Sequence, residues 1–87
     1  MAFVYIIKSL VNDRYYIGST NDLKRRINEH NKGVSKYTRL TKPFKLVFSQ
    51  EYDSLEKARK IEYKLKKFKN REIIDRIVKE KVIKMGA

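Results

Sequence analysis

The sequence predicts an α+β domain built from a small three-stranded antiparallel sheet flanked by three helices, in the order ββαβαα. Two observations support this class. Three runs rich in Val, Ile, Phe and Tyr are bounded by turn residues, which is typical of strands. Three other segments place apolar residues at helical spacing after residues that favour helix starts. The length of 87 residues suits one domain, so we expect residues 1–87 to form a single unit.

The first two strands are predicted at residues 2–9 and 14–19, with the turn pair Asn12-Asp13 between them. If the loop contains two residues, Tyr5 lies opposite Thr20. Side chains alternate along a strand, so any loop of even length puts three residues on one face. These residues are Tyr5, Tyr16 and Gly18. A glycine inside a strand indicates a bulge or a close backbone approach.

The remaining elements follow from capping residues and periodicity. A helix is predicted over residues 22–31, ending at Gly33, and a third strand over residues 44–52. Alternation places Phe44, Leu46 and Phe48 on one face of that strand. Two further helices are predicted over residues 55–68 and 71–84, the second with Asn70 as its cap and an apolar stripe that contains Ile73, Ile74, Ile77, Val78 and Val82.

Composition narrows the function classes. The formal net charge of +12 favours a polyanionic partner, with nucleic acid first and an acidic membrane surface second. Residues 21–45 contain eight basic and two acidic residues. Residues 57–71 contain eight basic residues and one acidic residue, Glu62. The sequence has no cysteine, no apolar run long enough to span a bilayer and no signal-peptide pattern. We therefore expect a cytoplasmic protein with no membrane association and no obligate protein partner.

Glu62 breaks the pattern of its predicted helix. It lies within the apolar stripe, about 40° from Ala58 around the helix axis, whereas Glu56 lies on the opposite side. A buried carboxylate is costly unless a cation or hydrogen bonds satisfy it. Two interpretations stay open: a site residue, or a glutamate at the edge of the stripe that pairs with a neighbouring lysine.

Arg26 and His30 are neighbours on the inward stripe of the first helix. A guanidinium binds phosphate oxygens bidentately, and an imidazole moves protons near neutral pH. The alternative is that both side chains cover the edge of the core, with the arginine stem packed and its guanidinium head in water.

These residues resemble the signatures of the GIY-YIG endonuclease superfamily, in particular its small stand-alone members related to the nuclease domain of excinuclease C. The first signature tripeptide matches Phe3-Val4-Tyr5, where only the tyrosine is kept, and the second matches Tyr16-Ile17-Gly18. The segment "DLKRRINEH" carries Arg26 and His30, and "KIEYKLKKF" carries Glu62. The resemblance covers about residues 2–75.

The resemblance implies a metal-dependent endonuclease that hydrolyses phosphodiester bonds in DNA. Its implied catalytic residues are Tyr5, Tyr16, Arg26, His30 and Glu62, with Glu62 as the ligand of Mg²⁺ or Mn²⁺. The phenols and Gly18 would form one wall of a catalytic groove and Arg26 the other. Further nucleic-acid contacts are expected at Gly18, Lys36, Tyr37, Arg39, Lys66 and Asn70, although Asn70 is equally well explained as a helix cap.

Two functions are compatible with these residues. The first is a structure-selective or weakly selective DNA endonuclease in repair or recombination, with DNA favoured over RNA as substrate. The second is a basic nucleic-acid-binding module that keeps the scaffold without cutting. A retained set of Tyr5, Tyr16, Arg26 and Glu62 favours the enzyme.

Overall fold

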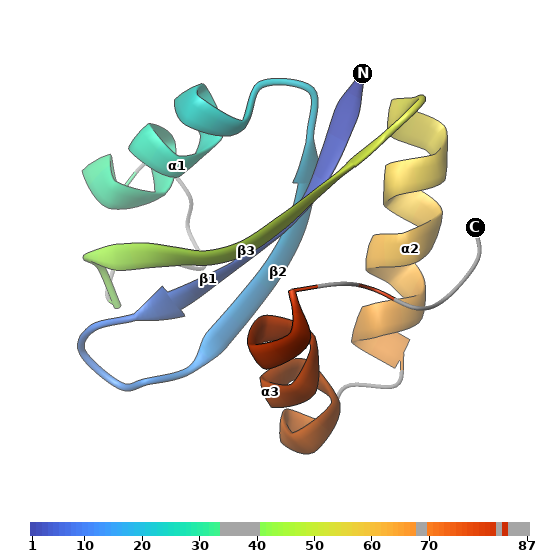
Figure 1. The fold of residues 1–87 in the computed structure, drawn as a ribbon. Coiled ribbons are helices and arrows are strands. Elements are labelled where there is room, and N and C mark those ends of the chain that lie inside the picture. The colour runs from blue at the N-terminus through green and yellow to red at the C-terminus, as the bar shows by residue number, and fades with distance from the viewer. Residues whose placement is uncertain (34–40, 68–69, 82, 84–87) are drawn as a thin grey trace.

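The computed structural model describes residues 1–33, 41–67, 70–81 and 83. The elements follow the predicted ββαβαα order (Figure 1). They are β1 (Ala2–Ser9), β2 (Tyr15–Thr20), α1 (Leu23–Lys32), β3 (Phe44–Tyr52), α2 (Leu55–Lys67) and α3 (Arg71–Glu80). Among these residues, no helix combines the length and the apolar character that crossing a bilayer requires.

The strands form an antiparallel sheet in the order β2-β1-β3. Tyr5 pairs with Gly18, so the predicted partner Thr20 is wrong by two residues. The turn is longer than two residues because Ser9 forms two backbone hydrogen bonds across it. Its amide donates to the carbonyl of Arg14, and its own carbonyl accepts from the amide of Asp13. The shift is even, so Tyr5 and Gly18 still share one face with Tyr16, as predicted.

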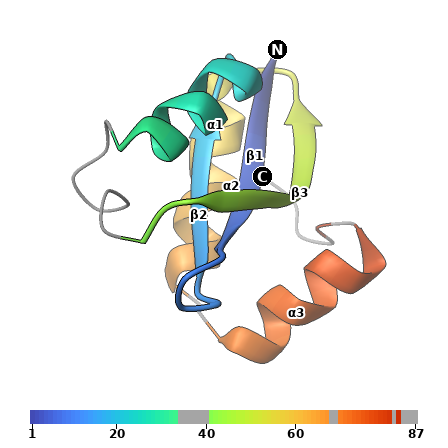
Figure 2. The same ribbon diagram turned by 90° about the vertical axis from the view of Figure 1, so that its left-hand side faces the viewer.

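The two faces of the sheet bury different clusters. One face packs against α2 and α3, and its cluster includes Val4, Ile6 and Ile61. The other face packs against α1 through a smaller cluster that contains Tyr5, Ile7 and Phe44. Figure 2 shows α1 in front of the strands and α2 behind them. The sheet therefore separates α1 from α2.

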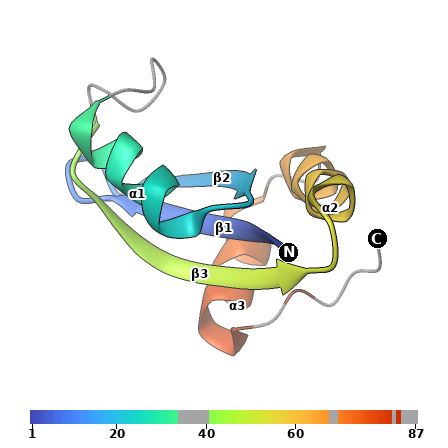
Figure 3. The same cartoon turned by 90° about the horizontal axis from the view of Figure 1, so that it is seen from above.

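The prediction that Phe44, Leu46 and Phe48 share one face of β3 is wrong. The pairing with β1 shifts between Ile6 and Ile7, which introduces an irregularity into the ladder. As a result Phe48 joins the cluster under α2, whereas Phe44 joins the cluster under α1. Leu46 is 38 % exposed. The strand curves visibly along its length (Figure 3).

The first two helices match their predicted ranges within one residue, but α3 ends at Glu80 and not at residue 84. Lys81 adopts the left-handed conformation, with φ 59°, which terminates the helix. The chain then returns to the sheet, where the Ile83 amide donates to Gln50 Oε1 at 3.0 Å. Ile73 is 38 % exposed and lies outside the core, and the predicted stripe position 82 lies outside the described residues.

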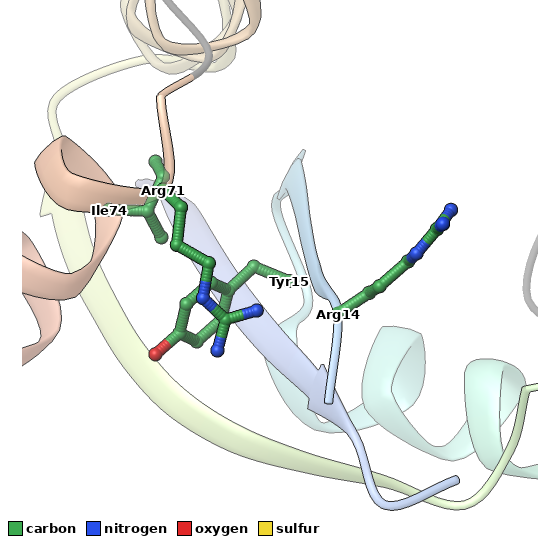
Figure 4. A pocket seen from close by; sticks show the side chains of 4 residues that line it. All are labelled: Arg14, Tyr15, Arg71 and Ile74. Atoms are coloured by element: carbon green, nitrogen blue, oxygen red, sulfur yellow. The ribbon is translucent and has the colours of Figure 1, made fainter. Parts of the chain in front are cut away.

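Tyr15 docks α3 onto the sheet (Figure 4). Its hydroxyl donates to Asp75 Oδ1 at 2.7 Å, and the guanidinium of Arg71 lies 4.7 Å from its ring centroid. Arg71 also donates to the carbonyl of Asp13 at 2.9 Å. Tyr15 and Arg71 line a cavity of about 360 Å³ with Arg14 and Ile74. These contacts explain Tyr15, the first tyrosine of the Tyr15-Tyr16 pair, as a structural residue.

Candidate active site

A buried tyrosine–histidine pair lies between β1 and α1. Tyr5 is 3 % exposed and His30 is 5 % exposed, and the Tyr5 hydroxyl lies 2.9 Å from His30 Nε2. The ring of Phe44 meets the imidazole edge-on, with centroids 5.9 Å apart. The imidazole of His30 is therefore packed inside the protein. His30 is the buried residue of α1, and its ring contacts both Tyr5 and Phe44.

Both members of this pair are neutral near pH 7. Burial lowers the pKa of His30 to about 4, and the positive charge of Arg26 acts in the same direction. Burial also raises the pKa of Tyr5, although the hydrogen bond from Arg26 opposes that rise. A neutral imidazole keeps one nitrogen as an acceptor. Nε2 of His30 is thus suited to accept the proton of the Tyr5 hydroxyl.

Gly18 provides the space for the Tyr5 ring. A Cβ at Gly18 would lie 2.3 Å from the Tyr5 hydroxyl oxygen and 2.4 Å from Cζ. The ring therefore crosses over β2 at this residue. Because β2 pairs only with β1 in the sheet described here, the Tyr5 hydroxyl lies toward an outer edge of the sheet. The predicted close approach at Gly18 is confirmed, and it involves a side chain of the protein itself.

Arg26 covers the Tyr5 hydroxyl on the solvent side. Its Nε donates to that oxygen at 3.4 Å, and its Nη1 lies 3.1 Å from Glu29 Oε1. Burial works to lower the pKa of Arg26, but its hydrogen bonds to Tyr5 and Glu29 outweigh burial and the pKa is raised. The side chain is 33 % exposed. Arg26 therefore presents a permanent positive charge at the surface of the pair.

Glu62 approaches from α2, on the opposite face of the sheet. Its Oε1 accepts a hydrogen bond from Ser19 Oγ at 2.5 Å, and its Oε2 lies 2.7 Å from Lys66 Nζ. The side chain is 19 % exposed. The lysine pairing left open by the sequence is present. Glu62 also acts electrostatically on Tyr5, where its charge contributes to the raised pKa of the phenol after burial.

The two groove walls expected from the sequence lie on the same side of the sheet. Tyr5 and Gly18 belong to the sheet, whereas Arg26 comes from α1, which packs on that face, and contacts Tyr5. The side chain that comes from the other side is Glu62, because α2 packs on the face opposite α1. The charged groups therefore flank β2, with Gly18 and Ser19 of that strand between them.

Other predicted residues have different partners. Tyr16 packs against the apolar cluster that contains Tyr5, meets Phe44 edge-on with centroids 5.3 Å apart, and its hydroxyl accepts from Thr41 Oγ1 at 3.4 Å. Asn70 caps α3, with its side chain accepting from the amide of Glu72 at 2.8 Å. The expected loop contacts at Lys36, Tyr37 and Arg39 lie outside the described residues.

Two partners of the site were not predicted from the sequence. Ser19 holds Glu62, and Glu29 holds Arg26. Glu29 follows Arg26 by three residues on a helix, so the i, i+3 rule would have found that pair. Ser19 carries no comparable signal, because its contact with Glu62 spans 43 residues of sequence.

The donors around Glu62 suit a magnesium or manganese ion with few protein ligands. No group of three or more His, Cys, Asp or Glu side chains placed to hold a metal occurs in the described part of the chain. Mg²⁺ commonly keeps several waters and takes only one or two carboxylates together with substrate phosphates. Glu62 provides one hard, partly exposed carboxylate, and the Ser19 hydroxyl lies beside it.

Known proteins resemble this chain over most of its length. The UPF0213 protein YazA of Bacillus subtilis is 38 % identical over 66 residues, which cover 75 % of this chain and 66 % of YazA. A UPF0213 protein of Staphylococcus aureus is 34 % identical over 80 residues, which cover 91 % of this chain and 95 % of that protein. The chain thus spans about two thirds of YazA and nearly all of the staphylococcal protein.

A solved structure has the same fold. The solution NMR structure of the UPF0213 protein BH0048 from Bacillus halodurans matches with a TM-score of 0.57 and 34 % identity, over 93 % of this chain and 87 % of that one. The family model of the GIY-YIG catalytic domain matches residues 1–75, a range that includes Tyr5, Arg26, His30 and Glu62. This chain therefore belongs to the GIY-YIG domain family.

Proposed function

We propose that this protein is a metal-dependent endonuclease that hydrolyses phosphodiester bonds in DNA. The observation that supports it is the meeting of three kinds of group around one strand. A guanidinium (Arg26), a phenol backed by a neutral imidazole (Tyr5 and His30) and a carboxylate (Glu62) flank β2. Phosphodiester hydrolysis requires these functions: charge stabilisation, proton transfer and a metal ligand.

In this proposal Arg26 binds the scissile phosphate. Its guanidinium is charged at all working pH values, and it retains donors beyond those used by Tyr5 and Glu29. The negative charge that grows on the phosphate oxygens would strengthen these bonds in the transition state.

Tyr5 and His30 together would manage the proton of the attacking water. With a raised pKa, the Tyr5 phenol is a poor base by itself. It can take a proton from water as its own proton passes to His30 Nε2, 2.9 Å away, which leaves hydroxide to attack phosphorus and an imidazolium on α1. Arg26 fixes the phenol oxygen during this transfer.

Glu62 would hold the divalent cation, Mg²⁺ or Mn²⁺, with water and phosphate oxygens as the other ligands. When bound, the cation supplies Lewis-acid stabilisation of the phosphate and the leaving oxygen. Lys66 occupies Glu62 Oε2 in this structure, so its ammonium has to turn away from that oxygen when a cation binds there. The released ammonium then remains available to a DNA phosphate.

We further propose structure-selective action on DNA, rather than RNA, in repair or recombination in the cytoplasm. The second candidate function is a basic nucleic-acid-binding module without catalysis. One observation favours it: both carboxylate oxygens of Glu62 have protein partners, since Ser19 Oγ donates to Oε1 and Lys66 Nζ pairs with Oε2.

Glu62→Gln distinguishes the two candidates. The amide keeps the size and the acceptor for Ser19 but loses the charge that holds a cation, so cleavage in Mg²⁺ should fall by at least about a hundredfold. The lost pair with Lys66 is half exposed and contributes about 1 kcal/mol or less to stability. Cleavage of labelled duplex and flap DNA, together with thermal melts, measures both effects.

The matched control is Glu56→Gln. Glu56 lies on the same helix and pairs with Lys60 at 3.8 Å, also at i, i+4, but on the exposed face. This variant should cut at the wild-type rate. A folded Glu62→Gln protein that also cuts at the wild-type rate would remove Glu62 from the proposed site. A wild-type protein that binds these DNAs but cuts none of them in Mg²⁺ or Mn²⁺ would support the binding module instead.

A further inference from the structure

Tyr63 is the large aromatic residue that α2 exposes. It is 68 % exposed, more than any other large hydrophobic side chain of the described helices. The helix needs no apolar residue there, since Ala58, Ile61 and Leu65 on the opposite side bury its core face. An exposed tyrosine offers a flat π surface for stacking at a low cost in side-chain entropy.

Basic residues surround Tyr63 on the helix surface. The positions three and four residues away on both sides are its nearest neighbours on a helix. All four are basic: Arg59, Lys60, Lys66 and Lys67. An apolar partner would meet four cations around this ring, whereas a polyanion with flat bases would match both the charge and the ring.

This surface continues directly from the proposed active site. At about 100° per residue, Lys66 lies about 40° beyond Glu62 around the helix axis and Arg59 about 60° beyond it. Tyr63 follows at about 100°. The ion pair between Lys66 and Glu62 joins this basic surface to the carboxylate of the proposed site. Arg59 and Tyr63 therefore lie on the part of the helix surface next to Glu62.

We infer that the outer face of α2 binds unpaired nucleotides next to the scissile phosphate, with a base stacked on Tyr63 and flanking phosphates on Arg59 and Lys66. A base in a duplex is stacked on its neighbours and cannot present its face to a side chain. The substrate is therefore DNA with a single-stranded part at the cleavage site, such as a flap or a gap. This inference rests on the proposed function for the position of the scissile phosphate.

The test measures binding in EDTA, where no cleavage occurs. Fluorescence anisotropy compares a blunt duplex, a flap of the same length and a single strand. Tyr63→Leu keeps an apolar side chain but removes the π surface, so affinity for the flap and the single strand should fall about tenfold. Affinity for the blunt duplex should stay within about twofold. Tyr63→Phe should bind all three as the wild type does.

Arg59→Ala supplies the control for charge. It should weaken binding to all three DNAs and reduce the slope of log affinity against log salt by about one, because a phosphate contact carries no base preference. Arg76→Ala, which removes an exposed arginine from α3, should leave the preference for flaps unchanged.

The outcomes separate this inference from the proposed function. If Tyr63→Leu binds flap and single-stranded DNA as tightly as the wild type, the stacking inference is overturned even if the protein cuts DNA. If Tyr63→Leu loses flap affinity and Tyr63→Phe retains it, the inference holds even if no metal supports cleavage. An equal loss for all three DNAs in Tyr63→Leu would also overturn it, because stacking requires unpaired bases.

Discussion

At the scale of single residues, the site separates neutral groups from charged ones. Tyr5 and His30 are almost fully buried and neutral, whereas Arg26 and Glu62 are partly exposed and charged. Burial is what keeps the first pair neutral, because it disfavours phenolate and imidazolium alike. The exposed pair can therefore contact a substrate while the buried pair stays neutral behind it.

Arg26→Ala should reduce DNA cleavage about a hundredfold or more, because it removes the guanidinium that contacts Tyr5 and is proposed to bind the phosphate. Arg25→Ala should reduce it only severalfold. Arg25 is exposed and lies about 100° away around α1. Single-turnover rates on one DNA measure both. Equal losses would show that the two arginines act only as general charge.

The free energy of unfolding should fall as the pH drops from about 6.5 to 4. Over that range the unfolded chain binds a proton at His30 that the folded protein, with a His30 pKa of about 4, does not bind. The loss attributable to His30 is about 2 kcal/mol. His30→Gln keeps an acceptor for Tyr5 but cannot titrate, so its stability should vary less with pH. Urea unfolding at pH 7.0, about 5.5 and about 4.5 provides the comparison; parallel curves for both proteins would contradict it.

At the scale of the elements, the sequence predicts the order and the shared face but not the pairing. Alternation placed Tyr5 and Gly18 on one side because any even shift preserves that relation. The shift itself depends on the bonds that Ser9 makes across the turn, and the division of Phe44 from Phe48 depends on one irregular step in the ladder. Such details arise from tertiary contacts, which local patterns do not encode.

The residues of the candidate active site were also predictable only in part. Arg26 and His30 were predictable from helical spacing, and Glu62 from its position in an apolar stripe. The side of the sheet from which each one comes was not, because it depends on which face each helix covers. Only the packing of α1 and α2 on opposite faces reveals that Glu62 lies across β2 from Arg26.

The docking of α3 should depend on the Tyr15 hydroxyl. Tyr15→Phe removes its hydrogen bond to Asp75 but keeps the ring that Arg71 covers, so stability should fall by about 1 kcal/mol. DNA cleavage at a temperature where the variant is folded should not change, because the lost hydrogen bond joins β2 to α3, whereas Arg26 and His30 come from α1 and Glu62 comes from α2. Chemical denaturation and the cleavage assay measure the two effects, and a loss of cleavage in the folded variant would contradict this separation.

At the scale of the whole molecule, the net charge of +12 dominates the expected behaviour. Binding to DNA should release counterions, so log affinity should fall linearly with log salt. With about four phosphate contacts, affinity falls about a hundredfold between roughly 50 and 200 mM salt. Titrations of one labelled DNA across that range measure the slope. An affinity that does not change with salt would contradict the basic-surface interpretation.

The arrangement of charged groups on both sides of β2 has a dynamic consequence. α1 is attached to the sheet by the smaller of the two apolar clusters, so its separation from the sheet should cost less free energy than separation of the α2 and α3 layer. A phosphodiester bound by Arg26 and, through a cation, by Glu62 would link α1 and α2 across β2. Such a ligand binds only the closed form, so it draws the equilibrium away from opening. The backbone amides of α1 would then exchange their hydrogens with solvent more slowly in the complex than in the free protein.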